Sequence, residues 1–220
     1  MAKPEIRRFS AYLGGICRAG GWAEARQTRT VRRMRWNVLL TALAVAASVL
    51  AGPGAACADQ RDPRLNTLFG ELEKAPDAKT AEGLANEIWG IWHHSGNAEI
   101  DRMLEVGVNA MYAQEYEAAF AMFNTVVEKA PEFAEGWNKR AHVEYLAGDY
   151  DSSIADVKKA LSLEPRHWNA LHGMGLIYEE MGEPVEALRW FEKALKLYPQ
   201  MPQLREHIDQ LRELTKGREI

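Results

Sequence analysis

The sequence lacks the residues and motifs on which many catalytic and metal sites depend. Both of its cysteines, Cys17 and Cys57, lie in the first 58 residues, so the rest of the chain offers no disulfide and no thiolate. It contains no Gly-x-Ser-x-Gly, His-Glu-x-x-His or Cys-x-x-Cys-His motif and no glycine-rich phosphate loop. Its six histidines are scattered. We therefore expect no enzyme activity, no metal site and no cofactor.

Basic residues are scarce outside the N-terminal part of the chain. Residues 1–58 hold 9 Lys and Arg against 2 Asp and Glu, a net charge of +7. Residues 59–220 hold 18 Lys and Arg against 29 Asp and Glu, a net charge of −11. Because nucleic acid binding needs a basic footprint, we expect no nucleic acid partner for this larger part.

An uncharged apolar run of 15 residues, Val38–Gly52, is shorter than the roughly 20 residues of a membrane-spanning helix. Arginines precede it and the small residues Ala56-Cys57-Ala58 follow it, which is the order of a secretory signal peptide. We predict a signal peptide at 34–58, cleavage after Ala58, a periplasmic location and no membrane span after its removal. Residues 1–33 are then an unstructured extension from a misassigned start, with translation beginning at Met34 or at Val31.

Two alternatives to this export route remain open. Cys57 could carry a lipid that anchors the protein to a membrane, although the preceding residues lack the leucine usual in lipoprotein signals. Arg32-Arg33 also fits the paired arginine of a twin-arginine signal, but the flanking residues match poorly.

A 34-residue repeat is the strongest pattern in the chain. Residues of similar type recur at this spacing in three series: Phe69, Met103, Trp137 and Leu171; Ala85, Ala119, Ser153 and Ala187; Trp89, Phe123, Val157 and Phe191. Each of the last three units ends at a proline: Pro131, Pro165 and Pro199. Each has two stretches with the apolar spacing of an amphipathic helix. Self-similarity of this length is typical of a helical solenoid.

Residue size alternates within the repeat. Small residues stand where helices must cross closely, at Gly107, Ala141 and Gly175. The turn between the two helices of a unit is predicted at Gln114-Glu115, Gly148-Asp149 and Gly182-Glu183.

These motifs resemble the tetratricopeptide repeat (TPR) family, here in an exported bacterial protein. The match is carried by Trp137, Ala141, Gly148-Asp149-Tyr150, Ala160-Leu161 and Pro165, and by Gly175, Tyr178, Gly182, Ala187, Phe191, Ala194-Leu195 and Pro199. The resemblance covers residues 100–201 and implies an all-α, right-handed α-solenoid of helix-turn-helix units at 100–133, 134–167 and 168–201.

Capping segments are predicted at both ends of the array. The register extends back over residues 66–99, where Glu73 and Asn97 depart from the pattern, so residues 59–99 are read as a degenerate repeat that caps the N-terminal end. Residues 202–220 contain an amphipathic stretch, Gln203–Lys216, that we expect to cap the C-terminal end. Its exposed apolar side leaves self-association possible.

The resemblance implies that the first helix of each unit lines a concave face. On this basis we predict a partner-binding groove formed by Tyr112, Asn138, His142, Tyr145, Asn169, His172 and Glu179. Few basic residues accompany them, so capture of a C-terminal carboxylate is not expected.

A structural ion pair is predicted inside the second unit. Arg140 stands where the other units have Val106 and Met174, and the resemblance implies that it pairs with Asp156. Glu144 lies one helical turn after Arg140.

The sequence therefore predicts an exported adaptor or scaffold that binds a protein or peptide partner through its concave face. A lipid-anchored envelope assembly factor, or a metal- or haem-handling accessory protein, is the alternative.

Overall fold

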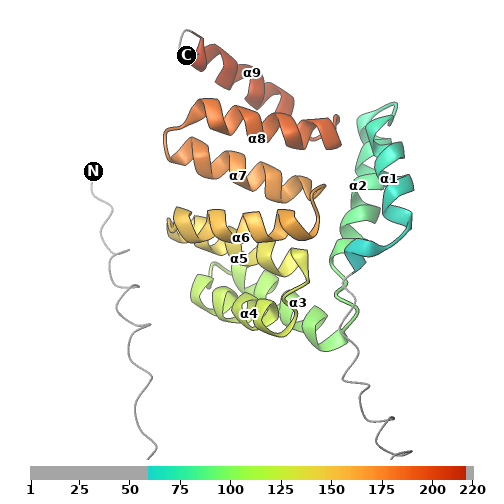
Figure 1. Ribbon diagram of the computed structural model, residues 1–220, viewed down its shortest axis with the longest axis vertical. Helices are drawn as coiled ribbons and strands as arrows, with labels where there is room; N and C mark the ends of the chain where they lie inside the picture. Colours follow the sequence, from blue (N-terminus) through green and yellow to red (C-terminus); the bar gives the residue numbers. More distant parts are fainter. Residues whose placement is uncertain (1–58, 217–220) are drawn as a thin grey trace, which may run out of the picture. The chain divides into compact units, whose positions relative to one another are not determined.

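The computed structural model describes residues 59–216, which belong to one compact unit of the chain beginning at Ala56 (Figure 1). The predicted signal peptide, its cleavage site, residues 1–33 and Cys57 lie outside the described residues. Within the described range one 3-10 turn and nine α-helices follow one another, with no strand: η2 (Asp59–Arg61), α1 (Arg64–Glu73), α2 (Ala78–Trp92), α3 (Ala98–Tyr112), α4 (Tyr116–Lys129), α5 (Ala134–Ala147), α6 (Tyr150–Leu163), α7 (Trp168–Glu180), α8 (Pro184–Leu197) and α9 (Leu204–Thr215).

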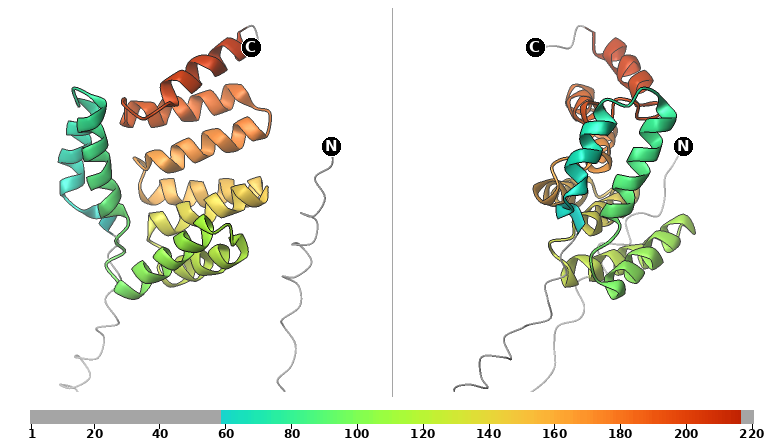
Figure 2. Two further views of the ribbon diagram at one scale, coloured as in Figure 1. Left: turned by 180° about the vertical axis from the view of Figure 1, so that it is seen from behind. Right: turned by 90° about the vertical axis from the view of Figure 1, so that its right-hand side faces the viewer.

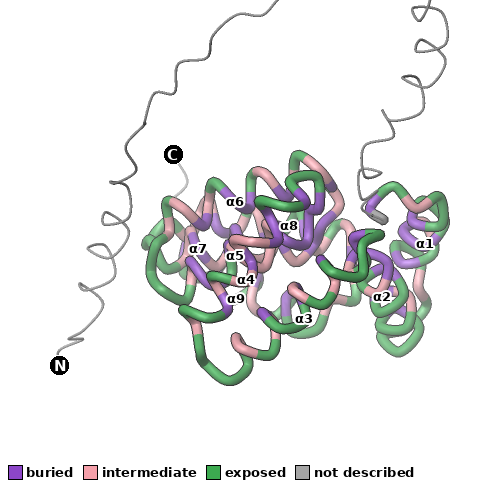
Figure 3. The backbone as a smooth tube through the Cα atoms, turned by 90° about the horizontal axis from the view of Figure 1, so that it is seen from below, coloured by how far each residue is buried: buried purple, intermediate pink, exposed green. Residues whose placement is uncertain are grey.

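Helices α3–α8 form three stacked helical hairpins, α3–α4, α5–α6 and α7–α8, and each hairpin packs on the next (Figures 1 and 2). The predicted α-solenoid is therefore confirmed. The hairpins correspond to the units at 100–133, 134–167 and 168–201, except that α3 begins two residues earlier, at Ala98. In Figure 3 the buried residues lie between neighbouring helices and the exposed residues follow the outer turns.

The turn within each repeat uses a left-handed residue. Gly148 and Gly182 have φ values of 78° and 79°, which glycine adopts without steric cost. Gln114 occupies the same place in the first repeat with a φ of 63°, and a side chain there is strained. After the second turn Asp149 caps α6 by accepting a hydrogen bond from the Ser152 amide at 3.2 Å.

Small and large residues interlock between the two helices of each repeat. A β-carbon added to Gly107 would lie 2.5 Å from the ring of Phe123, and one added to Gly175 would overlap the ring of Phe191. The second repeat instead pairs Ala141 with the smaller Val157, and both are buried. Residue size is therefore matched within each unit, as the sequence predicts.

Helix α9 covers the C-terminal end of the stack. Its buried residues Leu204, Ile208 and Leu211 pack with Phe191. Leu214, the next leucine along the helix, is 70% exposed, and Thr215 is buried instead. Because Thr215 lies eleven residues after Leu204, close to three full turns, it returns to the buried side of the helix.

The N-terminal hairpin α1–α2 does not stack on α3, which differs from the predicted capping repeat. It forms a separate apolar cluster with the inter-repeat residues Trp168 and Tyr198, and α1 also contacts α8 (Figure 2). Glu73 stands where the repeats have glycine or alanine, and it is the exposed last residue of α1, so this position is not a close helix crossing here. Trp89, aligned with the buried Phe123, is accordingly 40% exposed.

Polar contacts also fix this hairpin along one edge of the solenoid. Gln60 donates from Nε2 to the Glu132 carbonyl at 2.5 Å, and its Oε1 accepts from the Ala134 amide at 3.1 Å. Arg166 donates to Asn66 Oδ1 at 2.8 Å. The η2 turn thus contacts the loop before α5, and the hairpin itself contacts the loop before α7.

Candidate functional site

Helices α5 and α7, the first helices of the second and third repeats, line a groove of about 240 Å³ together with two residues of α6. Three buried apolar residues contribute to its lining, Ala141, Val157 and Ile177. Polar and aromatic side chains complete it: Asn138, Lys139, His142, Tyr145, Ser153, Asn169 and His172. The groove therefore offers amide, imidazole and phenol groups beside apolar surface.

Five of the seven residues predicted for a partner-binding groove line this cavity: Asn138, His142, Tyr145, Asn169 and His172. Two do not. Tyr112 lies at the end of α3 and is 79% exposed. Glu179 is bound by α9, with its Oε2 2.9 Å from Nε2 of His207. The C-terminal helix therefore already engages one carboxylate that we had assigned to a partner.

The two imidazoles of the groove are neutral above pH 7. Burial lowers the pKa of His172 to about 4, and the nearby His207 adds to this effect. His142 keeps an exposed edge, but desolvation of its ring, followed by the charge of Lys139, also lowers its pKa. Lys139 is the one cation among the lining residues, and its Nζ lies 3.1 Å from Glu135 Oε1. The groove thus presents no uncompensated positive charge.

A buried acid beside the groove was not predicted. The side chain of Glu135 is 0% exposed, and its Oε2 lies 2.9 Å from His167 Nε2. Its Oε1 lies 3.4 Å from His93 Nε2 and close to Lys139. Burial alone would raise the pKa of Glu135, but Lys139 and the two histidines outweigh burial and hold that pKa well below its usual range.

The Glu135 centre joins the N-terminal hairpin to the repeats. His93 is the C-cap residue of α2, and His167 is the N-cap residue of α7. Trp92 stacks on the His167 ring, with centroids 4.3 Å apart and planes 12° from parallel. Glu135 also accepts a hydrogen bond from Asn138 Nδ2 at 2.9 Å, so the same carboxylate fixes an amide that lines the groove.

The repeat pattern gives no sign of this centre. Asp101 and Asn169 stand 34 residues before and after Glu135, so an acid recurs in two of the three units and nothing singles out Glu135 as buried. The available signal is the local excess of tryptophan at Trp89, Trp92 and Trp168, which are larger than the apolar residues at the same positions of the other units.

The ion pair expected inside the second repeat is present. Arg140 donates to Asp156 from Nε and Nη2 at 2.6 and 2.8 Å, and to Asn124 Oδ1 from Nη1 at 2.7 Å. Glu144 Oε1 lies farther away, 3.9 Å from Arg140 Nε. Burial, followed by the adjacent Asp156, raises the pKa of Glu144 to about 8. Asp156, which accepts both short hydrogen bonds, is therefore the ionic partner of Arg140.

Among residues 59–216, no group of three His, Cys, Asp or Glu side chains is arranged to hold a metal ion. No helix in that range is long and apolar enough to cross a membrane.

The chain is similar in sequence and in structure to known proteins. Residues 132–200 match the family model described as tetratricopeptide repeat. A TPR repeat-containing protein of Rhizobium etli is 32% identical over 154 residues, covering 70% of this chain and 76% of that protein.

Two solved structures share the fold at low identity. The first TPR of Spaghetti bound to an HSP90 peptide has a TM-score of 0.51 and 15% identity, covering 54% of this chain and 94% of its own. The Yersinia enterocolitica secretion chaperone SycD with a YopD peptide has a TM-score of 0.50 and 15% identity, covering 55% of this chain and 94% of its own. The stacked hairpins, the repeat register and the Rhizobium relative lead to one conclusion: this chain belongs to the tetratricopeptide repeat family.

Proposed function

We propose that this protein is a binding scaffold, not an enzyme, that holds an extended segment of a protein partner in the groove between α5 and α7. The observation that carries the proposal is the lining of that groove, where amide and phenol groups stand beside apolar surface on two rigid helices. Amides can bond a peptide backbone, while Tyr145 and Leu176 supply apolar contact. Two proteins of the same fold, Spaghetti and SycD, have peptides bound, which supports this use of the fold.

A capture experiment tests the groove. The full chain, tagged at its C-terminus, is crosslinked in cells and compared with a His142→Ala/Tyr145→Ala/His172→Ala variant whose helicity is verified by circular dichroism. A Lys158→Ala/Lys196→Ala/Gln200→Ala variant is the matched control, because those side chains are exposed on the outer helices or the loop after α8. The partner should be lost only with the groove variant. Equal capture by all three proteins would contradict a groove site.

We further propose that the protein works in the periplasm after export through residues 34–58. The order of basic, apolar and small residues supports this proposal. Mass spectrometry of the purified protein from the cell envelope tests it. An N-terminus at Asp59 is expected, an acylated Cys57 would indicate the lipid-anchored alternative, and retention of residues 1–33 would contradict both.

A further inference from the structure

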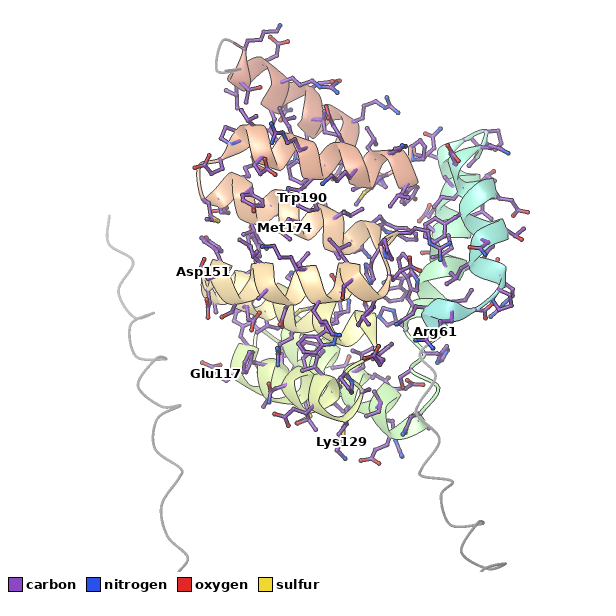
Figure 4. The ribbon with its side chains drawn as sticks, in the orientation of Figure 1. Arg61, Glu117, Lys129, Asp151, Met174 and Trp190 are labelled. Carbon is purple, nitrogen blue, oxygen red and sulfur yellow. The ribbon has the colours of Figure 1, made fainter. Side chains whose placement is uncertain are left out.

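The solenoid has two long edges of different character. One edge, where α5 and α7 begin, is covered by the hairpin α1–α2. The opposite edge contains the turns within the repeats, and we call residues 112–117, 146–151 and 180–186 the turn edge. Glu117 and Asp151 mark it in Figure 4, on the side away from α1, α2 and Arg61. No described element of the chain packs over the turn edge in these views.

Large apolar side chains are exposed along the turn edge. Tyr112 is 79% exposed, Leu146 is 41% exposed and Met181 is 44% exposed. Each stands at the C-terminal end of the first helix of its repeat. They are three of the six large apolar residues exposed to this degree among residues 59–216, so half of that set gathers on one edge. An apolar row of this kind with a polar border indicates a surface for another protein.

The border of this row is acidic. Seven carboxylates lie on the turn edge and none of its three segments contains Lys or Arg: Glu115, Glu117, Asp149, Asp151, Glu180, Glu183 and Glu186. Of these seven, only Glu186 takes part in an ion pair within the described chain, with Arg189. The exposed apolar residues are therefore flanked by six carboxylates that form no ion pair within residues 59–216.

The negative potential of the turn edge extends into the groove. Tyr145 lines the groove and directly precedes Leu146. Burial raises the pKa of Tyr145, and the charges of Glu180 and Glu179 add to the shift. The groove supplies no opposing charge, because its imidazoles are neutral and Lys139 is paired with Glu135. The Tyr145 ring lies 6.0 Å from the ring of Tyr150 on the turn edge, so the groove ends beside these carboxylates.

Resting on the proposed function, we infer that the partner segment is both basic and apolar. Its Lys or Arg side chains meet the carboxylates of the turn edge, and its apolar side chains cover Tyr112, Leu146 and Met181 before the segment continues into the groove. The partner of the related Spaghetti domain is chemically opposite, since its peptide SRMEEVD carries three acidic residues. Charge complementarity of this kind chiefly increases the rate of association, and it makes binding depend on salt concentration.

Defined peptides test this inference on the full chain. Three labelled peptides of equal length are compared by fluorescence anisotropy: one of Lys, Leu and Ser, a second with Glu for every Lys, and a third with Ser for every Leu. The basic apolar peptide is expected to bind about tenfold more tightly than either of the others, and its affinity should fall as salt rises.

Variants locate the binding. Glu117→Gln/Glu180→Gln/Glu183→Gln should weaken the basic apolar peptide about tenfold and flatten the salt dependence. Tyr112→Ser/Leu146→Ser should abolish the preference for Leu over Ser. The matched control, Glu71→Gln/Glu73→Gln/Glu87→Gln, removes the same charge from exposed residues of the hairpin and should bind as the unchanged protein does.

Several outcomes would overturn the inference. If the acidic peptide bound as tightly as the basic apolar peptide, the turn edge would have no role in binding. The same would follow if the hairpin control weakened binding as much as the turn-edge variant does. A dimer dissolved by Tyr112→Ser/Leu146→Ser in light scattering would assign the edge to a second copy. Peptide binding that requires removal of residues 1–58 would assign it to the chain's own basic N-terminal part. If the captured partner depends on the groove but binds through an acidic segment, this inference fails while the proposed function stands; loss of groove dependence ends the proposed function itself.

Discussion

The stacked helices α3–α9 and the hairpin α1–α2 are held in place by different kinds of contact. The stack repeats one apolar arrangement, in which a large residue such as Phe123 or Phe191 fills the space beside a small one. The hairpin is attached by contacts that occur once, around the buried Glu135 and the stacked rings of Trp92 and His167. The positions of the stacked helices are therefore determined by the sizes of their buried side chains. The position of the hairpin depends on polar contacts as well.

The difference has an energetic side. Apolar packing tolerates substitution when the total volume is kept. A buried charge must keep its partners, because an unpaired ion in the interior is costly. We expect the hairpin to be sensitive to single polar changes and the stack to be sensitive to size.

The largest effect is expected from Glu135→Gln. Loss of the buried charge leaves Lys139 without its anion and should weaken attachment of the hairpin by about 3–5 kcal/mol. Hydrogen exchange is the measurement: amides of α1 and α2 should exchange faster while those of α7 and α8 keep their protection. Glu132→Gln, at an exposed acid three residues earlier, is the control. Unchanged protection in α1 and α2 would show that apolar contacts alone hold the hairpin.

A size change inside the stack comes next. Gly175→Ala places a methyl group against the Phe191 ring and should destabilise the protein by about 1–3 kcal/mol in urea unfolding. Adding Phe191→Val recreates the Ala141 and Val157 pair of the second repeat, so the double variant should be more stable than the sum of the two single effects predicts. Gly173→Ala is the control, since its added β-carbon meets nothing within 4 Å. Additive losses would contradict size matching within the repeat.

The two buried carboxylates of α5 should respond to pH in opposite directions. The pKa of Glu144 is raised from 4.5 to about 8, so between these values the unfolded chain releases a proton that the folded chain keeps, and stability falls as pH rises. Glu144→Gln should therefore be more stable than the unchanged protein by about 1–2 kcal/mol at pH 8 and equal to it at pH 4. The pKa of Glu135 is lowered, so its contribution is present above its usual range and is lost in acid.

Urea unfolding at several pH values measures this comparison. A gain for Glu144→Gln that is the same at every pH would mean that proton uptake by Glu144 does not cause it.

The smallest effect is expected at the first turn of the stack. Gln114→Gly relieves a left-handed backbone conformation that the other two repeats assign to glycine, and should stabilise the protein by about 0.5–1 kcal/mol in thermal unfolding. The reverse change, Gly148→Gln, should destabilise it by a similar amount. Equal melting temperatures for all three proteins would show that the turn carries no strain.

The same difference between stack and hairpin explains which parts of the structure could be predicted from the sequence. Helix pairs, turns and size matching follow from local periodicity, and residues such as Phe123, Gly148 and Pro165 carry that pattern directly. Most of the groove could be predicted for the same reason, because Asn138, His142 and Tyr145 share one face of a single helix.

The hairpin could not be placed in this way. Its contacts join residues far apart in the chain, such as His93 with Glu135 and Gln60 with Ala134, and no repeat encodes them. Glu73 was visible as a departure from the pattern, but the pattern alone could not show where the displaced hairpin would bind. Tyr112 and Glu179 were predicted in the groove from their positions in the repeat. Tyr112 is instead exposed beside the first turn, and Glu179 contacts His207 of α9.

Helical solenoids bend like springs, by small changes in the spacing of successive repeats along their edges. The hairpin and the η2 turn before it contact three such points: Gln60 of η2 binds the loop before α5, α1 binds Arg166 in the loop before α7, and the hairpin packs with Tyr198 at the end of α8. Because these three points lie along one edge, the hairpin resists changes in the spacing of the repeats and rotation of one repeat against the next. We therefore expect the distance between α5 and α7 to change little under mechanical force or when a partner segment binds.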